Sequence, residues 1–126
     1  MQWEFHNDAP IYAQVMERVE RRIVSGALAP GERLPSVRTF ALEAGVNPNT
    51  MQKALTELER RGLIYSQRTA GHFVTEDRAV IAAVRRELAS AQADRFLQGM
   101  RELGFPPAQT IELLRQKLEQ EENKEE

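Results

Sequence analysis

Hydrogen-bonding side chains of several kinds gather between residues 36 and 53 of this 126-residue chain. Hydroxyl, amide, guanidinium and ammonium groups of this kind contact phosphates and base edges in nucleic-acid-binding proteins. The residues are Ser36, Arg38, Asn47, Asn49, Thr50, Gln52 and Lys53. They are the candidate binding residues of the chain if the local structure presents them together.

Two short helices joined by a tight turn would present them in this way. Ser36 is a natural N-cap, because its hydroxyl can accept from the free N–H groups of a first helical turn, and Gly45 can adopt the left-handed conformation that ends a helix. Asn47 then caps a second helix, in which Pro48 takes the first position, where no N–H is needed. The pattern predicts a helix over about 36–44 and another that starts at Asn47.

The second helix has two different faces. Met51, Ala54, Leu55 and Leu58 follow the spacing of one buried stripe, which leaves most of the polar residues on the opposite side. A short helix, a turn and an amphipathic helix with a polar start indicate a helix-turn-helix.

A longer amphipathic helix precedes this pair. Ile11, Val15, Val19 and Ile23 recur every four residues between Pro10 and Ser25, and Gly26 follows as a stop. Pro30 and Gly31 then favour a turn over residues 29–32.

A β-hairpin is expected after the second helix of the pair. Gly62 ends that helix, residues 63–68 have strand composition, residues 69–71 form a turn, and residues 72–74 return. Three helices and a hairpin in this order indicate a mainly α fold, a winged helix-turn-helix. We expect residues 1–75 to form this DNA-binding domain.

Helical patterns also fill residues 76–126. One runs from about Asp77 to Leu103, Gly104 closes it, and another restarts after Pro107, with a polar tail over 119–126 that we expect to fray. The apolar series of the first is too extensive for a small winged domain to cover, so we expect these helices to form a dimerisation element. The series is Ile81, Val84, Leu88, Phe96, Met100 and Leu103.

Four segments resemble the N-terminal domain of GntR-type transcription regulators. They are Pro30–Arg38, Val46–Ala54, Leu58–Ile64 and Gly71–Val74, within a match over about residues 10–74. The Asn-Pro-Asn-Thr helix start and the short C-terminal part are similar to the small YtrA-like branch of that family. The resemblance implies a bacterial homodimer that binds DNA, often as a repressor of transporter operons including its own.

The resemblance also implies roles for individual residues. Arg38 matches the arginine that reads a guanine, the residues at the start of the second helix match those that touch bases and phosphates, and Arg68 and Gly71 match the wing. Thr69 departs from the family, which usually has glycine there. The reach of the wing into the minor groove is therefore left open.

Composition excludes several other classes of protein. The chain has no cysteine and a net charge of −2. It has no apolar run long enough to span a membrane and no signal-peptide profile at its start, so we expect a cytoplasmic protein. His6 and His72 lack partners at metal-ligand spacing, and no nucleophile stands out, so we expect no metal, no cofactor and no enzymatic activity.

The charge distribution still allows a local basic face. Residues 1–75 contain nine Lys and Arg against eight Asp and Glu, whereas residues 76–126 contain eight against eleven. The acidity is therefore concentrated in the second part of the chain.

Simpler interpretations accompany each of these assignments. The Asn and Thr residues could serve only as helix caps, Arg38 could pair with Glu43, and Lys53 could be an ordinary solvated charge. Trp3 and Phe5 are expected to be a small hydrophobic cover. The alternative function is a winged-helix module for protein contacts without sequence-specific DNA binding, which a weak dependence of DNA binding on salt would reveal.

Overall fold

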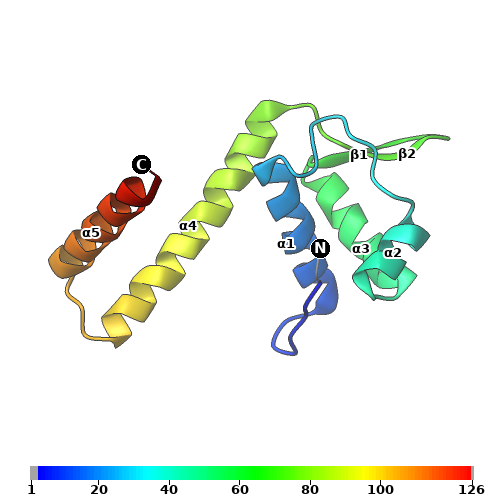
Figure 1. The fold of residues 1–126 in the computed structure, drawn as a ribbon. Coiled ribbons are helices and arrows are strands. Elements are labelled where there is room, and N and C mark those ends of the chain that lie inside the picture. Colours follow the sequence, from blue (N-terminus) through cyan, green and yellow to red (C-terminus); the bar gives the residue numbers. More distant parts are fainter. Residues whose placement is uncertain (1–2, 126) are drawn as a thin grey trace. The chain divides into compact units, whose positions relative to one another are not determined.

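The computed structural model describes residues 3–125, which form five helices and one hairpin (Figure 1). In chain order these are α1 (Ile11–Ser25), α2 (Val37–Ala44), α3 (Pro48–Arg60), β1 (Ile64–Gln67), β2 (Gly71–Val74), α4 (Arg78–Glu102) and α5 (Pro107–Glu125). The predicted mainly α, winged helix-turn-helix fold followed by two helices is confirmed.

The chain divides into two compact units, of which the first ends at Leu88 and the second begins at Ala89. The boundary expected at residues 75/76 therefore lies inside the first unit. The reason is that the start of α4 packs into the core of that unit, where Ile81 and Val84 are each only 5% exposed.

Helix α3 lies at the centre of the first unit and contacts α1, α2 and β1. Its stripe of Met51, Ala54, Leu55 and Leu58 is fully buried, as its spacing predicts. The stripe packs with apolar residues of α1, α2, the hairpin and α4 in one core. Each fully buried side chain of the size of Leu or Met contributes roughly 1.5 to 3 kcal/mol to stability.

A third extended segment pairs with the two-stranded hairpin. Ile64 is opposite Val74 and Gln67 is opposite Gly71 in the antiparallel β1–β2 ladder. Residues 31–34 pair with the other edge of β2, through hydrogen bonds that include Leu34 N–H to the His72 carbonyl at 2.9 Å. The sequence predicts only a turn at 29–32, which Glu32 N–H closes onto Ala29 at 3.0 Å.

The N-terminal segment covers one side of the core. Trp3 packs edge-on against Phe40, with ring centroids 5.8 Å apart, and lies 6.2 Å from Phe5. The guanidinium of Arg22 lies 4.8 Å from the Trp3 ring, and partial burial there lowers the pKa of Arg22. These contacts confirm the expected hydrophobic cover.

The second unit consists of the remainder of α4 and helix α5. Met100 and Thr110 are buried in it, and the Thr110 hydroxyl donates to the Pro106 carbonyl at 3.2 Å. Helix α5 continues to Glu125 and so includes most of the polar tail, whose fraying stays a prediction. The polar tail is supported as a helix by ion pairs such as that of Arg115 with Glu119.

Candidate nucleic-acid interface

The start of α2 presents one cap and one free guanidinium. Ser36 Oγ accepts from Thr39 N–H at 3.2 Å, which confirms the predicted cap. Arg38 follows one residue inside the helix and is exposed. Its side chain makes no ion pair or hydrogen bond with any residue from 3 to 125, so the pairing with Glu43 considered above does not form. Its donors are available to a ligand.

Only some of the polar side chains at the start of α3 act as helix caps. Asn47 Oδ1 accepts from Asn49 N–H at 2.8 Å, and Pro48 is the first helical residue. The side-chain amides of Asn47 and Asn49 are exposed, and Thr50 is half-buried. Gln52 is exposed and donates to the Thr56 hydroxyl one turn later at 3.2 Å. Capping therefore accounts for one amide oxygen of the cluster.

Lys53 has a neighbour that the sequence pattern does not reveal. Its ammonium nitrogen lies 4.0 Å from the centroid of the Tyr12 ring in α1. A cation–π contact at an exposed site is worth about 0.5 to 1 kcal/mol, which a phosphate contact could replace. Lys53 is nevertheless exposed, and its ammonium lies over the Tyr12 ring rather than standing free on the helix.

The wing turn accommodates Thr69 without strain. Ala70 N–H donates to the Gln67 carbonyl at 3.0 Å to close the turn. The positive φ that the hairpin needs occurs at Gly71, with φ of +99°, and no non-glycine residue in the described part of the chain has a positive φ. Thr69 thus replaces the usual glycine at a position that does not require one here. Arg68, at the turn, is exposed.

Ion pairs hold the other end of α3. Arg61 Nη1 lies 2.6 Å from Glu20 Oε1 of α1, and its Nη2 pairs with Glu87 of α4. The Glu20 side chain is 6% exposed, and its burial raises its pKa although Arg61 acts in the opposite direction. Arg85 of α4 donates to the Val24 carbonyl at 3.0 Å. These contacts join α1, α3 and the first turns of α4.

The expected dimerisation residues fall into two groups. Ile81 and Val84 are buried and Leu88 packs against the core of the first unit, so the expectation that they await a partner subunit is corrected. In the second unit Met100 is 8% exposed, whereas Phe96 and Leu103 are 39% and 73% exposed. The apolar side chains left exposed there also include Leu97, Phe105, Ile111, Leu114 and Leu118.

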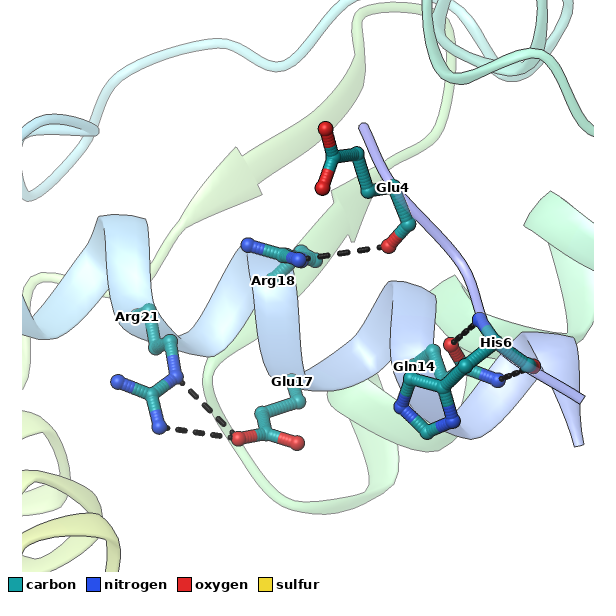
Figure 2. A pocket seen from close by; sticks show the side chains of 6 residues that line it. All are labelled: Glu4, His6, Gln14, Glu17, Arg18 and Arg21. Carbon is teal, nitrogen blue, oxygen red and sulfur yellow. Dashed lines mark hydrogen bonds and ion pairs between the residues drawn. The ribbon is translucent and has the colours of Figure 1, made fainter. Parts of the chain in front are cut away.

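A hollow of about 250 Å³ beside α1 is lined by residues that bond to one another through side chains and backbone (Figure 2). Gln14 exchanges two hydrogen bonds with the backbone of His6, at 2.8 and 2.9 Å, and Arg18 donates to the Glu4 carbonyl. Arg21 pairs with Glu17 at 3.1 Å. These contacts hold the N-terminal segment against α1, and they occupy polar groups that a ligand would need.

The part of the chain that the structure describes contains neither a metal site nor a membrane-spanning helix. No group of three His, Asp or Glu side chains comes together there as a metal site requires. No helix among these residues is both long and apolar enough to span a bilayer.

A winged helix with exposed polar groups at the starts of α2 and α3 and at the wing defines a DNA-binding protein of the helix-turn-helix class. Residues 11–74 match the family described as bacterial regulatory proteins, gntR family. The chain belongs to the GntR family of transcription regulators, and double-stranded DNA is its partner. Membership in a family of regulators also confirms the prediction of a non-enzymatic protein.

Two curated relatives come from Bacillus subtilis. The HTH-type transcriptional regulator YhcF is 34% identical over 109 residues, which cover 86% of this chain and 90% of that protein. The HTH-type transcriptional repressor YtrA is 39% identical over 71 residues, covering 56% of this chain and 55% of that protein. The predicted YtrA-like branch is confirmed.

Solved structures show the same fold and a DNA complex. A GntR family transcriptional regulator from Listeria monocytogenes has a TM-score of 0.80 at 33% identity and covers 89% of this chain and 98% of its own. The DNA-binding domain of AraR in complex with operator ORX1 has a TM-score of 0.54 at 30% identity, covering 60% of this chain and 99% of its own. The winged domain of this chain is thus similar to one that binds an operator.

Proposed function

We propose that this protein is a homodimeric repressor that binds an inverted-repeat operator, and that this operator controls a transporter operon that includes its own gene. The observation that carries the proposal is the exposed side-chain donors of Arg38, Asn47 and Asn49 at the starts of α2 and α3, which are unpaired among the described residues of this winged helix-turn-helix. The YtrA relative is a repressor, which supports repression here.

Each side chain has a role in this proposal. Arg38 reads a guanine, because its two parallel donors fit the O6 and N7 acceptors in the major groove. Asn47, Asn49, Thr50 and Gln52 contact base edges and phosphates at the start of the recognition helix α3. Ser36 and Lys53 contact the phosphate backbone, and Arg68 with the backbone at Gly71 contacts the DNA through the wing.

The dimer follows from the apolar side chains that the second unit leaves exposed. Phe96 and Leu103 are among them, and a second copy of this unit is the occupant that we propose for them. A dyad presents two recognition helices to one face of the duplex about one turn apart, roughly 34 Å, which requires an inverted repeat.

The test is a footprint on the DNA upstream of the protein's own operon, read for an inverted repeat, followed by the same measurement with Arg38→Ala. We expect the wild type to protect two half-sites. A good bidentate contact is worth about 1 to 3 kcal/mol of base discrimination, so the variant should lose roughly five- to 150-fold in its preference for operator over random DNA.

Arg86→Ala is the matched control, because Arg86 is an exposed arginine on α4 of the same unit. It should retain the preference of the wild type. If Arg38→Ala binds operator and scrambled DNA in the wild-type ratio, the base-reading role is wrong. A binding constant that hardly changes with salt would favour the alternative module for protein contacts.

A further inference from the structure

The extended segment before α2 carries an arginine onto the wing sheet. Gly31 N–H donates to the Val74 carbonyl and Val74 N–H donates to the Glu32 carbonyl, both at 2.9 Å. Arg33 is thereby held directly opposite Phe73 of β2. Its backbone position is fixed on both sides by sheet hydrogen bonds.

Strand register places the Arg33 side chain on the outer face of this sheet. Residues directly opposite in antiparallel strands share a face, so Arg33, Phe73 and Tyr65 form one row across the three segments. Leu34 and Val74, the next residues along, are 3% and 0% exposed and thus face the core. Phe73 and Tyr65 stack with centroids 5.6 Å apart.

Gly71 makes room for the guanidinium near the wing turn. It lies two residues before Phe73 and therefore on the same face, but it has no side chain there. Arg33 Nε and Nη2 lie 3.6 and 3.7 Å from the position that a Cβ of Gly71 would occupy. Arg33 is exposed and forms no ion pair or side-chain hydrogen bond with any residue from 3 to 125.

We propose that Arg33 binds a backbone phosphate of the DNA and joins the wing contact to the helix-turn-helix contact. It lies next to Gly71 in space and three residues before Ser36 in sequence, so it stands between two parts of the proposed interface. A free guanidinium held by sheet backbone is a preorganised partner for a phosphate. The proposal rests on the DNA-binding function proposed above.

The experiment compares Arg33→Ala with the wild type on the footprinted duplex and on a random-sequence duplex over a range of salt. One lost phosphate contact removes about 0.9 from the slope of log K against log salt, which is about eightfold in affinity at 0.1 M salt. We expect this loss on both duplexes, because a phosphate contact does not depend on sequence. Arg33→Lys should restore most of the slope.

Controls separate this inference from folding and from the proposed function. Arg86→Ala should keep the wild-type slope, and Arg33→Gln, which retains the stem across Phe73, should repeat the loss if Arg33→Ala lowers the melting temperature. An unchanged slope in Arg33→Ala and Arg33→Gln, or a loss confined to the operator, would overturn the phosphate role. A wild type that binds neither duplex would instead overturn the proposed function.

Discussion

Asn47 shows how one side chain can serve the fold and leave a group for DNA. Its Oδ1 accepts the Asn49 N–H at 2.8 Å, and its Nδ2 makes no hydrogen bond with the described residues. Ser36 likewise uses its oxygen as a cap. The caps hold the helix starts in place, while the Arg38 guanidinium is left without a partner among residues 3–125. Capping by Asn47 and Ser36 is therefore compatible with the DNA contacts that we propose for the same residues.

Lys53 allows a test at the scale of a single residue. Lys53→Ala should weaken binding to operator and random duplexes by a similar factor and make the salt slope shallower by about one, because a phosphate contact is lost. Titration by fluorescence anisotropy at several salt concentrations measures both quantities.

Tyr12→Leu is the control for this prediction, because it removes the ring beneath the ammonium and keeps Lys53. The slope should then remain that of the wild type. A Lys53→Ala loss confined to one base pair of the site would assign Lys53 to base reading instead.

At the scale of elements, Arg61 links the C-terminal end of α3 to two other helices. Glu20 lies in α1, Glu87 lies in α4, and both pair with the same guanidinium at the C-cap of α3. Burial raises the pKa of Glu20 even with Arg61 beside it. Removing Arg61 would leave a buried carboxylate without its cation, which is costly.

Arg61→Met should lower the free energy of unfolding at pH 7 by about 3 kcal/mol, the lower end for a broken buried pair because Arg61 is about a third exposed. A raised pKa means that the folded state holds the proton more tightly than the unfolded chain. The contribution of Glu20 is thus fully present below its ordinary pKa near 4.5 and is lost as pH rises through the raised value. Because Arg61 lowers the pKa of Glu20, its loss raises that pKa further in the variant, and the deficit should shrink as pH falls from 7 toward 5.

Urea unfolding at both pH values measures this deficit. Arg60→Met is the matched control, because the Arg60 side chain is 75% exposed and pairs only with Glu57 among the described residues. It should change stability by less than about 1 kcal/mol at either pH. An Arg61→Met deficit that stays constant with pH would show that Glu20 is not the group responsible.

At the scale of the whole molecule, the apolar pattern of α4 serves two different purposes. Its first turns complete the core of the winged unit through Ile81 and Val84. Its later residues belong to the second unit, which leaves Phe96 and Leu103 exposed. A test of dimerisation must therefore change the later residues, because a charge at the earlier ones would unfold the winged unit.

Phe96→Glu with Leu103→Glu should give a monomer by sedimentation, because two unpaired charges would have to be buried in the proposed interface. Helical content by circular dichroism should be retained. Affinity for a full operator should fall to the level of weak half-site binding.

Leu42→Glu provides the matched control, because Leu42 is an apolar residue of α2 that is 79% exposed in the first unit. This variant should remain a dimer. A double variant that also remains a dimer would show that Phe96 and Leu103 do not form the interface. Helix α1 offers little apolar surface for an interface, because Val15, Val19 and Ile23 are buried and Ile11 is only 37% exposed.

Most of the fold could be predicted from signals between residues close in the sequence. The caps at Ser36 and Asn47, the stop at Gly45 and the spacing of the α3 stripe are decided by residues within a few positions of one another, so the helix-turn-helix could be predicted from sequence. Only the tertiary structure decided which apolar side chains of α4 complete the core, since burial depends on segments distant in the chain. For the same reason the sequence did not predict that the Tyr12 ring lies beneath Lys53 or that Arg33 lies beside Gly71. Each results from packing between elements or from strand register, and the local pattern around either residue carries no signal of its partner.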